Sequence, residues 1–197
     1  MQDHPGPPKS LCKNLVIRKV AGVWYRSFDS KYGAAGPLYF GHSDFRFNSP
    51  DGSFAVLYAS MTVRGMFMET FGRKHRKWDT QKFMESKSVA ELKSEDLSLI
   101  DITGRGLLAI GADARLATGR YKMTQKWAAW LHSHPITDGI LYRSRHDSDC
   151  ECAAIFDRAA SKLQTRAIHD LATKDGKLFL VDTLRYYKFK IRKSPRR

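Results

Sequence analysis

Short hydrophobic segments, some continuous and some alternating with polar residues, are mixed along the chain with segments of helical period. The segment 16–25 is rich in residues that favour strands, and 54–60 is an apolar run typical of a buried strand. Charged and apolar residues alternate over 188–192, which is the pattern of a half-exposed strand. We expect further short strands at 97–102, 140–142 and 153–156.

Apolar residues recur at helical spacing in two segments. Over 62–71 they fall on one face, with Glu69 between them. Over 123–131 they follow the spacing of an amphipathic helix, and Pro135 marks its end. The remaining expectations are a helix over 161–172, a loop over 30–37 and a turn over 50–52. Because strands and helices are mixed without a regular βαβ period, the pattern predicts an α+β fold.

The length of 197 residues suits one domain. We expect a disordered leader at 1–12, a single domain at 13–192 and a basic tail at 193–197. No apolar run approaches the roughly 18 residues of a membrane span, and the start of the chain lacks the apolar region of a signal peptide, so we expect neither an anchor nor export. Three cysteines make a poor disulfide framework, which favours a reducing cytoplasmic location.

The formal net charge is +14 and is unevenly distributed. From Thr183 to the end there are seven Lys or Arg residues and no acid, and a second basic run lies at 73–77. Such surfaces attract nucleic acid, anionic lipid or an acidic protein, but a solvated face with a basic tail explains them equally well. No helix-turn-helix, zinc-finger or RNP motif is present, so direct nucleic-acid binding is not favoured.

Familiar catalytic motifs are absent from the sequence. It has no P-loop, no G-x-G-x-x-G and no G-x-S-x-G, so nothing supports a P-loop enzyme, a Rossmann dehydrogenase or an α/β-hydrolase. Cys150 and Cys152 have the spacing C-x-C, and no second pair has the C-x-x-C or H-x₃₋₅-H spacing of a zinc site. We therefore expect no metal, and we interpret the nearby histidines as ordinary loop residues: His132, His134 and His146.

Five polar residues stand in apolar surroundings: Arg26, Arg46, Tyr58, Glu69 and Ser144. A charged side chain in an apolar strand or helix must be paired or must face a cleft. The residues alone leave two interpretations open, namely structural ion pairs with surface residues, or a functional cleft.

The sequence resembles the RES domain in a series of short blocks that keep the family's order. The blocks are 23–26 (VWYR), 45–48 (FRFN), 56–60 (VLYAS), 67–71 (FMETF), 138–147 (DGILYRSRHD) and 153–157 (AAIFD). The family is named for an Arg, a Glu and a Ser, which Arg26, Glu69 and Ser144 match. One position departs from the pattern: the family often has Gly before its second Arg, where this sequence has Phe45, and this leaves the role of Arg46 open.

The resemblance implies a fold similar to that of ADP-ribosyltransferases, with a mixed β core of split sheets, surrounding helices and an NAD⁺ cleft. Family members are toxins of two-gene, type II toxin–antitoxin systems. The implied activity is NAD⁺ degradation by cleavage of the nicotinamide–ribose bond, through hydrolysis or phosphorolysis, and the implied partner is an antitoxin with an Xre-like helix-turn-helix domain. One alternative is an ADP-ribosyltransferase that modifies a host protein. The other is a non-catalytic nucleic-acid-binding domain, which depends on charge alone.

Cleavage of the nicotinamide bond makes an oxocarbenium-like ribose, as in glycoside cleavage. We expect the carboxylate of Glu69 to contact the ribose hydroxyls and to stabilise this developing cation. Arg26 and Arg46 suit the pyrophosphate, because guanidinium groups bind phosphate bidentately. Tyr58 is expected to stack on nicotinamide or to hydrogen-bond the ribose. Ser144 is expected to form a hydrogen bond rather than act as a nucleophile, because the sequence places no His or Asp to activate it.

Overall fold

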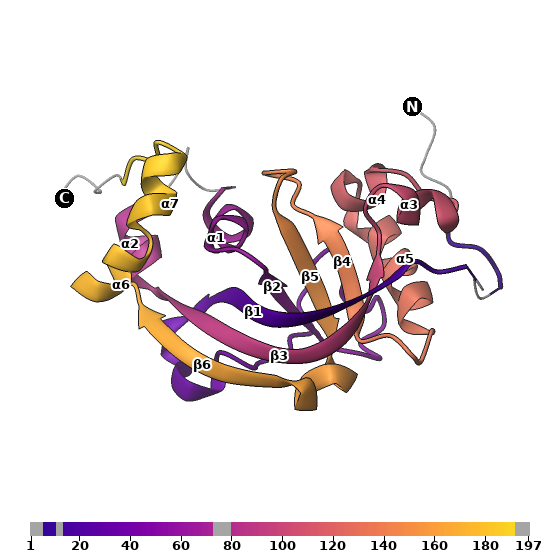
Figure 1. Cartoon of the computed structure of the whole chain (residues 1–197), viewed down its shortest axis with the longest axis horizontal. Coiled ribbons are helices and arrows are strands. Elements are labelled where there is room, and N and C mark those ends of the chain that lie inside the picture. Colours follow the sequence, from indigo (N-terminus) through magenta and orange to yellow (C-terminus); the bar gives the residue numbers. More distant parts are fainter. Residues whose placement is uncertain (1–5, 11–13, 73–79, 192–197) are drawn as a thin grey trace.

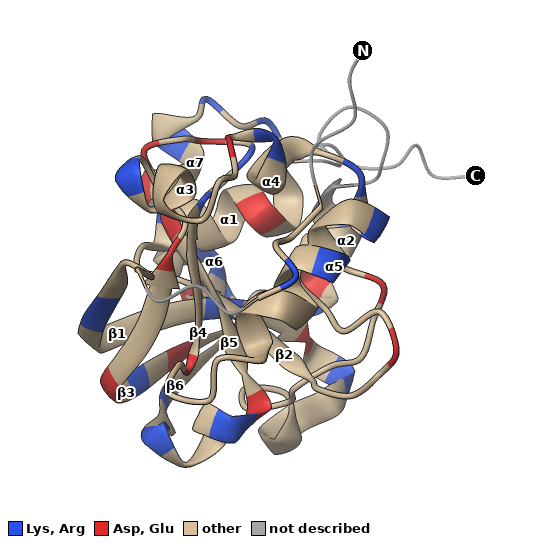
Figure 2. Ribbon diagram, turned by 90° about the vertical axis from the view of Figure 1, so that its right-hand side faces the viewer, with Lys and Arg blue, Asp and Glu red and all other residues tan. Residues whose placement is uncertain are grey.

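The computed structural model describes residues 6–10, 14–72 and 80–191. Most of the expected leader at 1–12, the basic run at 73–77 and the expected tail at 193–197 lie outside the described residues. Within the described part, Lys and Arg positions are spread over strands, helices and loops around the molecule (Figure 2). No single element therefore accounts for the positive charge of the described chain.

The described strands form one hydrogen-bonded sheet in the order β1-β2-β5-β4-β3-β6 (Figure 1). Strand β1 also pairs with β3, so β1, β2, β5, β4 and β3 close into a ring, and β6 pairs with β3 outside it. Neighbouring strands are antiparallel except β3 and β4, which are parallel. The strands are β1 (Ile17–Asp29), β2 (Val56–Ser60), β3 (Lys87–Asp101), β4 (Gly139–Arg143), β5 (Glu151–Phe156) and β6 (Leu163–Asp170).

Helices gather at two ends of this sheet. Figure 1 shows α2, α6 and α7 at one end and α3, α4 and α5 at the other, with α1 between the first group and the strands. Strands and helices are thus combined as the α+β expectation requires. The α-helices are α1 (Val63–Phe71), α2 (Thr80–Glu85), α3 (Arg105–Ala109), α4 (Arg115–Thr118), α5 (Tyr121–His132), α6 (Lys174–Phe179) and α7 (Val181–Tyr186), and the 3₁₀ helices are η1 (Ser30–Ala35) and η2 (Asp157–Lys162).

The two longest strands, β1 and β3, form a curved ribbon. They pair from Ile17 opposite Ile100 to Asp29 opposite Lys87. The register shifts between Val20 and Gly22, and Gly22 has a φ of +144°, which a residue with a side chain rarely adopts. An irregularity of this kind bends a strand and increases its twist, in keeping with the curvature of β1 in Figure 1.

Side chains from all five ring strands meet in one buried cluster, which includes Trp24, Leu57, Leu92, Leu141 and Ile155. Alternate residues of β2, β5 and β4 point to the opposite face, because successive side chains of a strand do so. That face packs against α5, where Trp127 and Leu131 are buried. These three strands are covered on both faces, which explains why they are apolar without interruption in the sequence.

Most expected elements are confirmed. The strands expected at 16–25, 54–60, 97–102, 140–142 and 153–156 correspond to β1, β2, the end of β3, β4 and β5. The helices expected at 62–71 and 123–131 correspond to α1 and α5. The expected loop at 30–37 instead contains the short 3₁₀ helix η1.

The helix expected over 161–172 is wrong. The segment forms the end of η2 and then β6, which pairs with β3 from Asp170 opposite Ser88 to Leu163 opposite Ser94. Most of its side chains are exposed or half-buried, so it has no apolar face that would pack a helix against the core. Pairing with the open edge of β3 satisfies its backbone instead, and this tertiary contact decides its conformation.

The strand expected over 188–192 is also wrong in its described part. Lys188 has a positive φ of 49°, and the backbone N–H of Phe189 donates to the carbonyl of Leu184 at 2.9 Å. The backbone here closes the end of α7 and does not join the sheet.

The expected split core is a single sheet. Strand β3 has 15 residues and pairs with β1 along one edge. Along its other edge, β3 pairs with β6 over Ser88–Ser94 and with β4 over Leu99–Asp101. The resemblance implied two separate sheets, whereas β3 pairs with β1, β4 and β6 and so joins all the described strands into one sheet.

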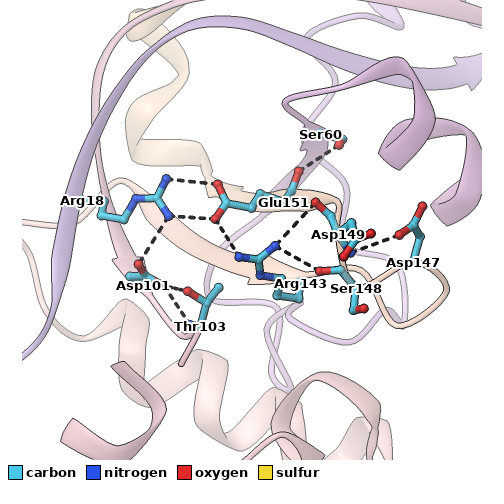
Figure 3. A network of polar contacts seen from close by, with 9 residues as sticks. All are labelled: Arg18, Ser60, Asp101, Thr103, Arg143, Asp147, Ser148, Asp149 and Glu151. Atoms are coloured by element: carbon cyan, nitrogen blue, oxygen red, sulfur yellow. Dashed lines mark hydrogen bonds and ion pairs between the residues drawn. The ribbon is translucent and has the colours of Figure 1, made fainter. Parts of the chain in front are cut away.

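A polar network ties β1 to β3 and β5 (Figure 3). The Arg18 guanidinium donates to both carboxylate oxygens of Glu151, at 2.9 and 3.0 Å, and lies 3.5 Å from the carboxylate of Asp101. The Asp101 carboxylate also accepts hydrogen bonds from the backbone N–H and hydroxyl of Thr103. The Arg18 side chain is 38% exposed, whereas those of Glu151 and Asp101 are 19% and 10% exposed, so its loss would leave two poorly hydrated carboxylates.

We predict that Arg18→Ala lowers the free energy of unfolding by about 1–2 kcal/mol, because both carboxylates lose a charge-assisted partner. Arg115→Ala is the matched control, since its pair with Asp113 is 44% and 47% exposed. Arg115→Ala should lower the free energy of unfolding by less than about 0.5 kcal/mol. Denaturant unfolding of the two variants measures both values, and equal losses would contradict a special role for the Arg18 network.

Candidate active site

Helix α1 carries Glu69 and is fixed where it begins. The Thr62 hydroxyl caps it by accepting a hydrogen bond from the backbone N–H of Gly65 at 3.1 Å. Gly65 rests on the end of β2, because a Cβ atom there would lie 2.1 Å from the Ser60 hydroxyl oxygen. That hydroxyl in turn donates to the carbonyl of Glu151 at 2.9 Å. The position of Glu69 is thus set by a close fit of helix on strand.

Four of the five residues singled out from the sequence line one pocket. Arg26 comes from β1, Arg46 from the segment before β2, Tyr58 from β2 and Glu69 from α1. The pocket encloses about 790 Å³ when the open space at its mouth is included. The fifth residue, Ser144, follows β4 and contacts Glu69.

The hydroxyl of Ser144 donates a hydrogen bond of 2.6 Å to the Glu69 carboxylate. It also accepts a bond from the backbone N–H of His146 at 3.2 Å, and the residue is buried. This hydrogen bond fixes the direction in which the Glu69 carboxylate points, so Ser144 orients Glu69. The structure thus shows one hydrogen-bond partner of Ser144, and its role toward a substrate stays a prediction.

Arg26 lies partly buried on the pocket wall. Its Nη1 atom is buried without a hydrogen-bond partner among the described residues. Burial lowers the pKa of the Arg26 guanidinium to about 10, so the group is still charged at neutral pH. A buried cation with an unused donor is costly, and an anion in the pocket would satisfy it.

Arg46 is buried and shapes the wall of the pocket. Its Nη1 atom donates to the carbonyl of Gly119 at 2.8 Å, and its guanidinium lies 5.0 Å from the centre of the Tyr121 ring. These contacts hold the junction between α4 and α5 against the pocket. The sequence predicted a phosphate contact for Arg46 and could not predict this second role.

The hydroxyl of Tyr58 is engaged on both sides. It accepts a hydrogen bond from the backbone N–H of Phe47 and donates one to the side chain of Asn48, both at 2.8 Å. Burial raises the pKa of the Tyr58 hydroxyl, so it stays protonated. Its proton is committed to Asn48, which leaves the ring, with Phe45 edge-on at 5.9 Å, as the part that faces the pocket.

A family model described as the RES domain matches residues 23–180, which is most of the chain. The protein belongs to the RES domain family. The match includes all five candidate residues, and it confirms the resemblance on which their roles were assigned. A search of curated proteins finds no match.

The RES domain fold is also found among solved structures. A chain in the crystal structure of the Mycobacterium tuberculosis MbcT–MbcA toxin–antitoxin complex superposes with a TM-score of 0.61 and 16% sequence identity. The superposition covers 84% of this chain and 90% of that one. At this low identity the comparison establishes the shared fold.

Sequence reasoning missed several residues that line the pocket of this RES domain, among them Tyr25, Phe45, Tyr121, Tyr142 and Arg145. A signal for Arg145 was available, because it directly follows Ser144 and adds a third guanidinium to the pocket. Phe45 was visible as an aromatic residue beside Arg46. Tyr121 carried no signal, because it reaches the pocket only through the packing of the α4–α5 junction.

Cys150 and Cys152 lie near the elements that carry the site, since the Thr62 hydroxyl contacts the Cys150 sulfur at 3.8 Å and Cys152 pairs with Ser60. The described residues hold no group of three or more His, Cys, Asp or Glu side chains placed to bind a metal ion. Cys152 belongs to β5, and burial raises the pKa of its thiol. Within the described part of the chain, no helix has the length and apolar character that crossing a bilayer requires.

We predict that Gly65→Ala destabilises the RES domain by about 1–3 kcal/mol, the usual cost of overpacking, because its Cβ would collide with the Ser60 hydroxyl. Adding Ser60→Ala removes the colliding oxygen but leaves the Cβ atoms of Cys150 and Ser60 at 3.0 and 3.1 Å, so the double variant should regain part of that loss. Gly41→Ala is the control, since the nearest atom to its Cβ would be 3.5 Å away. Unfolding curves of these three variants and of Ser60→Ala alone test this fit, and purely additive losses from Gly65→Ala and Ser60→Ala would contradict it.

Proposed function

We propose that this RES domain protein is the toxin of a type II toxin–antitoxin system and that it degrades NAD⁺ by cleaving the nicotinamide–ribose bond. The observation that supports this most is the pairing of charges in the pocket. Glu69, oriented by Ser144, is the acidic residue among the described residues that line it, and Arg26, Arg46 and Arg145 are the basic ones. NAD⁺ has the complementary pattern of a cationic nicotinamide and an anionic pyrophosphate.

Glu69 is the residue to which we assign the chemistry. When the C–N bond breaks, its electron pair leaves with nicotinamide, which becomes neutral, and the ribose becomes an oxocarbenium-like cation. A leaving group that starts as a cation needs no protonation, so no general acid is required. The carboxylate stabilises the developing positive charge, and the Ser144 hydroxyl holds it in place beforehand.

Arg26 and Arg46 are the groups to which we assign the pyrophosphate. The unused buried donor of Arg26 suits a phosphate oxygen, and the guanidinium is protonated at neutral pH. Water or phosphate then attacks the ribose carbon. Water gives ADP-ribose and a proton, whereas phosphate gives the phosphorylated sugar. Transfer to a protein side chain would make the enzyme an ADP-ribosyltransferase, and product analysis distinguishes the three.

The partner that we propose is an antitoxin with an Xre-like helix-turn-helix domain. The similar fold within a solved toxin–antitoxin complex supports an antitoxin partner, the Xre-like domain rests on the family resemblance, and the net charge of +14 favours a partner with acidic residues.

We predict that Glu69→Gln lowers the rate of nicotinamide release by about 10²–10³-fold, because it removes one preorganised charge. The dissociation constant for NAD⁺ should change less than about tenfold, since the phosphates are held elsewhere. Arg26→Ala should weaken binding as well. Chromatography of nicotinamide, NAD⁺ titration and thermal melting on the same purified proteins provide the test, and a folded Glu69→Gln variant with near-normal release would refute the assignment.

We also predict that expression without the partner stops growth and lowers cellular NAD⁺. Growth and the NAD⁺ content of cells are measured after induction of the wild type and of Glu69→Gln. Growth arrest with unchanged NAD⁺ would favour protein ADP-ribosylation over degradation.

A further inference from the structure

The segment 144–150, here called the Ser144 loop, is folded by its own backbone. The backbone N–H of Ser144 donates to the carbonyl of Cys150 at 3.0 Å, and the N–H of Cys150 donates to the carbonyl of Asp147 at 3.1 Å. The Asp147 carboxylate accepts from the N–H of Asp149, and Arg143 donates to the carbonyl of Ser148, as Figure 3 shows. Asp147 is therefore central to the loop that presents the Ser144 hydroxyl to Glu69.

Tyr187, just after α7, contacts two elements that carry residues of the site, the Ser144 loop and α1. Its hydroxyl donates a short hydrogen bond to the Asp147 carboxylate in the Ser144 loop. Its ring stacks on Phe67, with centroids 6.1 Å apart and planes at 11°. Phe67 lies two residues before Glu69 in α1 and is fully buried. One side chain thus touches the helix that carries Glu69 and the loop that carries Ser144.

We infer that Tyr187 is a positioning residue of the active site, which holds the Ser144 loop against α1 so that the Ser144 hydroxyl meets the Glu69 carboxylate. The inference rests on the proposed function of Glu69. Tyr187 lies beyond residue 180, where the match to the RES domain ends. A residue that follows α7 therefore serves the active site, although none of the residues that line the pocket comes from α7.

The contact with Asp147 is a specific one. The hydrogen bond from Tyr187 lowers the pKa of the Asp147 carboxyl, which keeps the acceptor charged and the bond strong. The ring is held between aromatic neighbours, since Phe67 stacks on one side and Tyr186 lies edge-on at 4.9 Å. Exposed loops open locally at low cost unless such contacts hold them. The hydrogen bond of 2.6 Å between Ser144 and Glu69 would be broken by a small displacement of the Ser144 loop, so the loop must be held in place.

Tyr187→Phe in the full chain tests the inference, because it removes the hydroxyl and keeps the ring. We expect kcat for nicotinamide release to fall about tenfold, the effect of one lost charge-assisted hydrogen bond, while KM for NAD⁺ changes less than about twofold. Asp147→Asn should reproduce this split. Tyr186→Phe is the matched control, since its hydroxyl has no partner on the Ser144 loop among the described contacts, and it should behave as wild type.

A double-mutant cycle with Ser144→Ala separates positioning from general stability. If Tyr187 acts through Ser144, Tyr187→Phe lowers kcat in the wild-type background and has no further effect in Ser144→Ala. An equal fall in both backgrounds, an unchanged kcat in Tyr187→Phe, or an equal fall in Tyr186→Phe would overturn the inference.

Amide hydrogen exchange gives a readout that does not depend on activity. The backbone amides of His146 and Cys150 should exchange about tenfold faster in Tyr187→Phe than in Tyr186→Phe. Unchanged exchange would overturn the inference even if NAD⁺ is cleaved. A wild-type protein that leaves NAD⁺ intact would refute the proposed function instead, and the exchange rates would still decide whether Tyr187 holds the Ser144 loop.

Discussion

The pairing of β5 with both β2 and β4 is the constraint on which the site depends. Both neighbours run antiparallel to β5, so β2 and β4 are parallel to each other and end at the same edge of the sheet. Cys152 of β5 lies opposite Ser60 on one side and opposite Tyr142 on the other. The segments that follow, α1 after β2 and the Ser144 loop after β4, therefore begin side by side. Glu69 and Ser144 meet for this reason, although they are 75 residues apart.

The charge of Arg26, near this edge of the sheet, lowers the stability of the fold because it is partly buried without a full set of hydrogen-bond partners. Arg26 is held on the pocket wall with a buried donor that no described protein group accepts from, and its pKa is lowered to about 10 by burial. A protein selected only for stability would replace it with an apolar side chain. Retention of a charged, partly desolvated group at a cleft is the pattern of a functional residue. The network of Arg18, Asp101 and Glu151, in contrast, satisfies its charges internally and serves the fold.

The sequence predicted those parts of the fold that depend on local pattern. Strands β2, β4 and β5 are buried on both faces, and α1 has an apolar face, so period and composition were sufficient. The segment of β6 was predicted as a helix, because its exposed residues carry little periodic information and pairing with β3 decides its structure. The contact of Ser144 with Glu69 could not be predicted from pattern, since it depends on the register of β5. The resemblance to the family identified these residues, but only the fold explains why they touch.

Arg46 illustrates why residue type matters as much as position in this pocket. A guanidinium presents five N–H donors in a rigid plane, so it can hold the Gly119 carbonyl, lie against the Tyr121 ring and still face the cavity. A lysine carries its charge on one nitrogen atom and lacks the planar surface for the aromatic contact. The wall formed by the α4–α5 junction and the charge presented to the pocket therefore depend on the same side chain. An anion that binds Arg46 would contact a group that already fixes the shape of its own site.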